Sequence, residues 1–223
     1  MNMNKADDKG FTALMLSVKE NEKDKAKALI EAGADVNAQN HDGDTALILS
    51  VKNSDPEMAE ILIENGADVN LPDYNCNTPL MFAARREKDV VTAKLLLANG
   101  ADANKKNCLG ETPLHKAAYL GLYNTVKLLL AKGADADGKD RNGHTPLHKT
   151  ARYDWDDVAD LLISAGAYRD MRRCDGIARG DGYVFGGNAF VSGESEEIIA
   201  AARNYRAFMT CSAEMSDTDS KRP

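Results

Sequence analysis

Aromatic residues and long apolar stretches are both scarce in this sequence. Aromatics make up 6% of the 223 residues, with a single tryptophan, so we expect a core of small, helix-favouring side chains such as alanine and leucine. Eighteen consecutive apolar residues, the minimum for a transmembrane helix, occur nowhere. The first eight residues are polar and lack the apolar stretch of a signal peptide. We therefore expect a cytoplasmic protein that has no membrane partner.

Positive charge is also in short supply. Lysine and arginine number 28 against 35 aspartates and glutamates, which gives a formal net charge of −7. A general nucleic-acid binder needs a basic surface that displaces counterions from the phosphates. Anionic membrane surfaces attract the same kind of positive patch. The charge balance therefore argues against nucleic acid and membrane lipid as partners.

The four cysteines form no metal or redox motif. They are Cys76, Cys108, Cys174 and Cys211, and no two of them make a C-x-x-C pair. This spacing excludes zinc ribbons and thioredoxin-type sites. Because the cysteines are few and widely separated, we expect reduced thiols and no disulfide framework.

An internal repeat is the strongest pattern that the sequence does contain. The triplet Thr-Ala-Leu or Thr-Pro-Leu recurs at intervals of 33, 33, 34 and 33 residues, with its threonine at Thr12, Thr45, Thr78, Thr112 and Thr145. The pair Gly-Ala recurs with the same spacing, its glycine at Gly33, Gly66, Gly100, Gly133 and Gly166. Both series place a one-residue insertion in the third unit, between Thr78 and Gly100.

Each unit reads as two helices followed by a turn. The threonine suits a helix N-cap, and the proline after it suits the first helical position. Apolar residues then follow at helical spacing, in the fourth unit as Leu114, Ala117 and Ala118. A second apolar run leads to Gly133, which fits the left-handed position beyond a helix end. Residues 134–143 are rich in Asp, Asn and Gly, which predicts an extended segment with a tight turn.

Such units bury their helices only by stacking, and the sequence resembles the ankyrin repeat family. The segments Thr112–Ala118 and Thr145–His148 carry that family's signature, and the resemblance covers about three-quarters of the chain. It implies an all-α repeat solenoid of stacked helix-turn-helix units with projecting β-hairpin loops. Within residues 1–170 the five expected repeats are 7–39, 40–72, 73–106, 107–139 and 140–170.

The pattern weakens at its edges. Cys76 stands where the hairpin glycine is expected, so we expect a distorted turn there. Residues 171–194 are rich in glycine and are expected to form a degenerate sixth repeat or a cap. Residues 195–210 have helical spacing, which predicts a capping helix or a docking helix for a partner. Residues 211–223 are expected to be a disordered tail.

Little in the sequence points to catalysis, and we expect no enzyme, metal or cofactor. His115 and His148 occupy equivalent repeat positions, on the order of 10 Å apart for stacked helices, which is too far to share a metal ion. A hydrogen bond within each repeat is the expected role. Residues 180–186 match neither a dinucleotide fingerprint nor a Walker loop. The recurring aspartates are expected to be structural: Asp35, Asp68, Asp102 and Asp135.

The resemblance implies a non-enzymatic scaffold whose concave groove binds another protein. Equivalent positions at the ends of the first helices hold a run of arginine and aromatic residues: Arg85, Arg86, Tyr119, Leu120, Arg152 and Tyr153. Hairpin residues that would border this run are Tyr74, Leu109, Arg141 and His144. The competing interpretation is a scatter of isolated exposed side chains. Trp155 is either a rim anchor or packed locally.

Other functions remain open at this stage. A secreted microbial effector or a regulatory inhibitor would use the same groove. A small-ligand or catalytic role would belong to the glycine-rich segment after residue 170. The segments ending in Asn37 and Asn70 resemble sites modified by asparaginyl hydroxylases in ankyrin repeats. We expect a monomer, and the partner's identity is not readable from the sequence.

Overall fold

The computed structural model describes residues 4–150, 153 and 155–167. Five helix pairs follow one another along this part of the chain. They are α1 (Ala13–Lys19) and α2 (Lys23–Glu31), α3 (Ala46–Lys52) and α4 (Pro56–Glu64), α5 (Pro79–Ala83) and α6 (Val90–Ala98), α7 (Pro113–Tyr119) and α8 (Tyr123–Ala131), and α9 (Pro146–Thr150) and α10 (Asp156–Ser164). The expected sixth unit, capping helix and tail lie outside the described residues.

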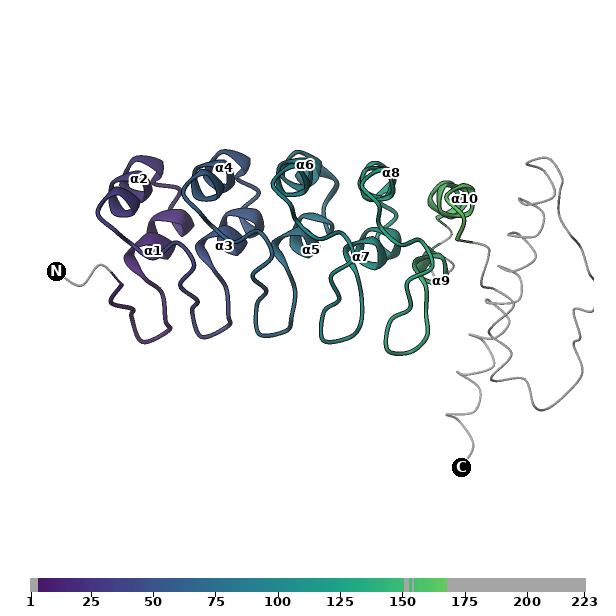
Figure 1. Ribbon diagram of the computed structural model, residues 1–223, viewed down its shortest axis with the longest axis horizontal. Coiled ribbons are helices and arrows are strands. Elements are labelled where there is room, and N and C mark those ends of the chain that lie inside the picture. The colour runs from purple at the N-terminus through teal and green to yellow at the C-terminus, as the bar shows by residue number, and fades with distance from the viewer. Residues whose placement is uncertain (1–3, 151–152, 154, 168–223) are drawn as a thin grey trace, which may run out of the picture.

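The helix pairs stack into an elongated solenoid. Figure 1 shows the second helices of all five pairs in one row, the first helices in a row below them, and the loops projecting beneath. Neighbouring first helices contact one another along the stack, as α1 contacts α3 and α7 contacts α9. The expected all-α repeat fold is therefore confirmed.

The repeated threonines begin the first helices as predicted. The side chains of Thr12, Thr45, Thr78 and Thr112 each accept a hydrogen bond from the backbone N–H three residues on, at 3.1–3.4 Å. Each bond satisfies a donor that the first turn of a helix leaves without an intrahelical partner.

The leucine that follows the repeated threonine by two residues forms the centre of the core. Leu47, Leu80 and Leu114 are 0% exposed, and small residues such as Ala83 and Ala117 let the helices approach closely. Burial of these side chains in one continuous core holds the repeats together.

The extra residue of the third unit lies in the turn between its two helices. In the first, second and fourth turns a single residue with positive φ leads into the second helix, namely Asn21, Ser54 and Gly121. In the third unit the 3-10 helix η1 (Glu87–Asp89) occupies this place, and α6 begins one residue later than its counterparts relative to Thr78. The insertion is thus absorbed without disturbing the stack.

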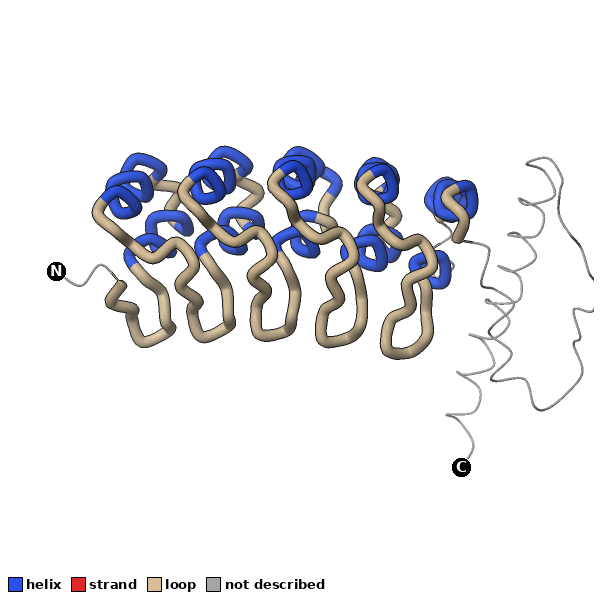
Figure 2. The backbone as a smooth tube through the Cα atoms, viewed as in Figure 1, coloured by secondary structure: helices blue, strands red, loops and turns tan. Residues whose placement is uncertain are grey.

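The hairpin loops contain no strand within the described part of the chain, and they project side by side from one edge of the stack (Figure 2). Their turns are held from inside, since the Asn40 Oδ1 atom accepts from the backbone N–H groups of Asp42 and Asp44 at 2.9 Å. One backbone bond joins each loop to the next, as from Tyr74 N–H to the Asp42 carbonyl at 3.2 Å.

A ladder of asparagines links the repeats at the start of the loops. The Asn70 Nδ2 group donates to the Gly100 carbonyl at 2.9 Å, and the Asn70 Oδ1 atom accepts from the Asp102 N–H at 2.8 Å. Asn37 and Asn104 make the same pair of contacts with their own neighbours. The recurring aspartates accept from the N–H two residues on, so their expected structural role is confirmed.

Two expectations about cysteine prove wrong. Cys76 and Cys108 form a disulfide between the third and fourth loops, with their Cα atoms 5.3 Å apart. Their spacing along the chain does not reveal this pairing, because the two residues meet only through the stacking of repeats. Nor is the turn at Cys76 distorted. Its φ of 62° lies in the same left-handed region as the glycines of the other turns, and its N–H bonds to the Asp73 carbonyl at 2.9 Å.

Candidate protein-binding surface

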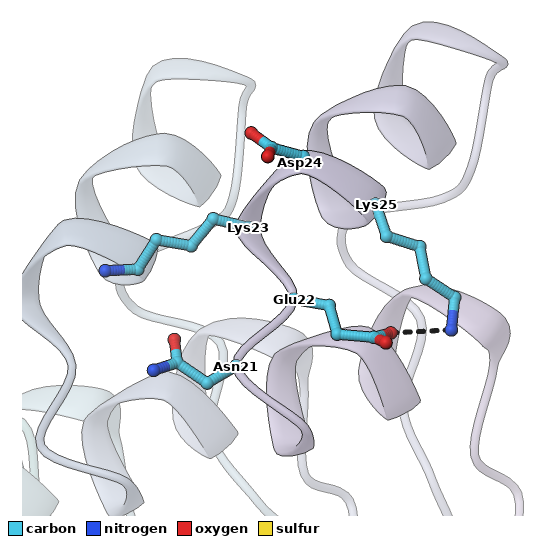
Figure 3. A pocket seen from close by; sticks show the side chains of 5 residues that line it. All are labelled: Asn21, Glu22, Lys23, Asp24 and Lys25. Carbon is cyan, nitrogen blue, oxygen red and sulfur yellow. Dashed lines mark hydrogen bonds and ion pairs between the residues drawn. The ribbon is translucent and has the colours of Figure 1, made fainter.

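One hollow in the described surface is open and lined by polar and charged residues. This hollow, beside the turn from α1 to α2, is lined by five consecutive residues, Asn21, Glu22, Lys23, Asp24 and Lys25 (Figure 3). Three of its four charged residues are already paired, Lys25 with Glu22 at 2.6 Å and Lys23 with Glu57 at 2.5 Å. The hollow is therefore ordinary polar surface.

Neither a metal site nor a membrane span is found in the same part of the chain. No three His, Cys, Asp or Glu side chains among residues 4–150, 153 and 155–167 gather as metal ligands would. No described helix is long and apolar enough to cross a bilayer.

The two signature histidines have the structural role expected of them. The His115 Nδ1 atom accepts from the Thr112 N–H at 3.2 Å, while Nε2 donates to the His144 carbonyl at 3.0 Å. Both ring nitrogens are therefore used in the neutral form. Burial lowers the pKa of His115, because the surroundings disfavour the charged ring.

His148 repeats this arrangement one unit later. Its Nδ1 atom accepts from the Thr145 N–H at 3.2 Å. Burial first, and then the neighbouring His144, lower the pKa of His148 to about 4. Both histidines are thus neutral groups whose Nδ1 atoms bond to the threonine at the start of their own repeat.

Tyr119 and Tyr153 form the most distinctive surface feature. Tyr119 ends α7, and Tyr153 lies in the turn after α9, one repeat further on. Their rings meet edge to face with centroids 5.2 Å apart, and their hydroxyl oxygens are hydrogen-bonded at 2.8 Å. Tyr153 is 47% exposed, and the neighbouring Leu120 is 37% exposed. Stacking therefore brings the predicted site residues Tyr119 and Tyr153 together, and Leu120 follows Tyr119 in the chain.

Trp155 packs against the backbone that follows Tyr119. Its indole Nε1 donates to the Tyr119 carbonyl at 3.2 Å. The ring lies directly over Gly121, where an added Cβ atom would clash with it. Of the two interpretations of Trp155, local packing is therefore the correct one, and this packing fixes the backbone that carries Tyr119.

The arginines of the predicted run do not share one role. Arg85 is exposed. Arg86 instead bonds to the preceding turn, since its Nη1 group donates to the Lys52 carbonyl at 2.7 Å and to the Ser54 hydroxyl at 3.1 Å. Arg152 lies outside the described residues. Of the two described arginines in the run, Arg86 is therefore bonded to the preceding turn, and Arg85 is exposed on the surface.

The predicted hairpin residues lie on the projecting loops and form a second set. Tyr74 is 65% exposed and Leu109 is 61% exposed, each near the tip of its loop. Arg141 and His144 are also exposed, and His144 Nδ1 lies 3.7 Å from the buried Asp140 carboxylate. The loops and the ends of the first helices are different edges of the stack, so the candidate surface has two parts.

Sequence reasoning missed two exposed apolar side chains. Tyr123, at the start of α8, is 38% exposed, and Val91 in α6 is 61% exposed. Both stand in the first turn of a second helix, and neither is among the site residues predicted from the sequence. Their exposure could have been predicted from their position in the first turn of the helix, which precedes its first buried residue. Tyr123 follows Leu120 by three residues and extends the apolar character of that turn.

The comparisons with known proteins agree with the architecture. A sequence model for ankyrin repeats matches three times, over residues 1–73, 29–107 and 80–173. No curated protein matches the chain.

Proposed function

The chain belongs to the ankyrin-repeat family, whose repeats generally serve as protein–protein interaction modules, and we propose that it binds a partner protein through Tyr119, Leu120 and Tyr153. This surface is hereafter the tyrosine surface. The loop residues Tyr74 and Leu109 form its second contact region. In this proposal the chain acts as a binding module and not as an enzyme.

The pairing of Tyr119 with Tyr153 carries this proposal. Tyr153 is exposed and Tyr119 is half-buried, and aromatic side chains that are already held in one arrangement lose little conformational freedom on binding. Tyrosine is also enriched at the energetic centres of protein interfaces. Here each ring holds the other in place, and Trp155 holds the backbone below them. The surface is thus organised before any partner arrives.

Charge supports a partner with exposed acidic side chains. Arg85, on the equivalent edge of the preceding repeat, and Arg141, on a loop, are both exposed. Guanidinium groups bind carboxylates in a bidentate manner, which favours such a partner. The net charge of −7 opposes this attraction at long range, so the contribution is one of fit at close contact.

A position-specific photo-crosslinking experiment tests the proposal. A photoreactive amino acid replaces Leu120 in one protein and the exposed Lys127, on the second helix of the same repeat, in another. Illumination in a lysate of the source cells is expected to link the same partner repeatedly through position 120 and not through position 127. Equal crosslinking from both positions would contradict the assignment of the surface.

A further inference from the structure

The pair Cys76–Cys108 occupies two loop positions that the fold brings into contact. In four loops the turn residue with positive φ is glycine, with φ between 77° and 82° (Gly10, Gly43, Gly110 and Gly143). In the third loop this residue is Cys76, although side chains with a Cβ atom rarely adopt such a backbone conformation.

Stacking explains why Cys76 meets Cys108. A Cβ atom added to Gly10 would lie 2.8 Å from His41 in the next loop, and one added to Gly110 would lie 2.7 Å from Arg141. The turn residues of the first, second and fourth loops therefore all point at the same position of the following loop. After Cys76 that position is Cys108, and the Cα separation of 5.3 Å falls within the usual disulfide range.

The bond lies where small thiols can reach it. Both cysteines are only half-buried. Their loops project from the edge of the stack, away from the core between the helices (Figure 2). Exposed disulfides exchange with dissolved thiols more readily than bonds sealed in a core. The location thus suits a bond that opens and closes.

We propose that Cys76 and Cys108 form a reversible, redox-controlled crosslink between the third and fourth repeats. In closing, one thiolate attacks a small disulfide of the glutathione class and releases one reduced thiol. The second cysteine thiolate then attacks the resulting mixed disulfide and releases the other. The two cysteines together lose two protons and two electrons, and the small disulfide becomes two thiols. Excess reduced thiol reverses both steps.

The crosslink makes two neighbouring repeats unfold as one unit. It closes a loop across a sequence separation of 32 residues, which restricts the unfolded chain. In a linear stack each repeat is otherwise held only by its neighbours. The closed bond therefore raises the resistance of the middle of the stack to denaturant, and this effect is independent of any partner.

Thiol counting in glutathione buffers tests the proposal. The starting protein carries Cys174→Ser and Cys211→Ser, so that Cys76 and Cys108 are the remaining thiols. In oxidised glutathione we expect no free thiol, and mass spectrometry of a digest should recover the peptides of Cys76 and Cys108 joined. In about 10 mM reduced glutathione we expect two free thiols and a lower urea midpoint. The unaltered chain, digested after the same treatments, should give the same linked pair.

Two matched variants provide the control. Cys76→Gly restores the residue of the other turns, and Cys108→Ser removes the second sulfur with little change in size. The urea midpoint of either variant, in the same background, should not depend on the glutathione buffer. The proposal is overturned if both thiols of the starting protein stay free, or end as mixed disulfides with glutathione, under oxidising conditions. It is equally overturned if the bond persists in the reduced buffer.

Discussion

The hydroxyl groups of Tyr119 and Tyr153 are hydrogen-bonded across two repeats, with their oxygens 2.8 Å apart. Their rings meet at an interplanar angle of 82°, an edge-to-face arrangement that aromatic pairs favour. The contact depends on the register of the stack, because the two residues are 34 positions apart in the chain. It is thus a surface feature that only the assembled solenoid can present.

The stability of such a stack should depend on position. Leu129 is 0% exposed in the fourth repeat, and Leu14 is 1% exposed in the first. Leu129→Ala should lower the free energy of unfolding by about 2–5 kcal/mol, as large-to-small core changes do. Leu14→Ala should cost clearly less, because the terminal repeat has a neighbour on one side and frays first. Urea denaturation measures both, and equal losses would contradict a linear arrangement of units.

The asparagine ladder gives a second prediction. Asn70→Ala removes both the Gly100 and the Asp102 contact, and we expect a loss of about 1–2 kcal/mol in the free energy of unfolding. Asn70→Asp keeps an acceptor for Asp102 but loses the donor for Gly100, so an intermediate loss is expected. Urea titrations compare the two. A loss for the aspartate variant at least as large as that for alanine would contradict this division of roles.

Low pH should lower the free energy of unfolding, because His148 is neutral in the folded chain and takes up a proton more readily once the chain unfolds. The folded pKa of His148, about 4, lies below the ordinary value of 6.5, so the unfolded chain binds more protons between these values. The stabilisation is complete above about pH 6.5 and is lost as the pH falls toward 4. Since the ring is partly exposed, we expect His148 to contribute a loss of about 1–2 kcal/mol by pH 4.5. Urea midpoints at a series of pH values measure it.

A glutamine variant separates this effect from that of the carboxylates. His148→Gln keeps a side chain able to complete the capping arrangement with Thr145, yet it does not titrate. Its urea midpoint should fall less steeply than that of the unaltered protein between pH 6.5 and 4.5. Asp140, although burial opposes its ionisation, has its pKa lowered by Lys149 and backbone N–H groups, so its own contribution is lost only at lower pH. Identical slopes for variant and unaltered protein would contradict the role of His148.

Much of the fold could be predicted because the same local sequence signals recur in every repeat. Threonine caps, proline at the first helical position and glycine just beyond a helix end, as at Gly133, all act within a few residues, and five copies reinforce them. The placement of Tyr119 and Tyr153 near the ends of successive first helices followed from the same register. These features depend on local sequence and period, which are visible without a structure.

The features that escaped prediction depend on contacts between repeats. The Cys76–Cys108 bond requires the distance between neighbouring loops, which the period alone does not give. Arg86 looked like a binding residue, but it bonds to the Lys52 carbonyl in the preceding turn, a contact that only the stacked repeats show. Trp155 was ambiguous because only the structure shows the space that Gly121 leaves beneath its ring.

The tyrosine surface is the central claim, and the affinity of a double variant for the crosslinked partner tests it most directly. Tyr119→Ala with Tyr153→Ala should weaken binding at least thirtyfold, about 2 kcal/mol, because truncating an aromatic anchor removes its buried contact. Tyr119→Phe with Tyr153→Phe keeps both rings and should retain most of the affinity.

Circular dichroism and the melting temperature of both double variants accompany the binding titration. The account predicts lost binding with a folded, normally melting alanine variant. An alanine variant that folds and binds with unchanged affinity would contradict the account, as would one that unfolds, since the two rings would then belong to the core and not to a binding surface.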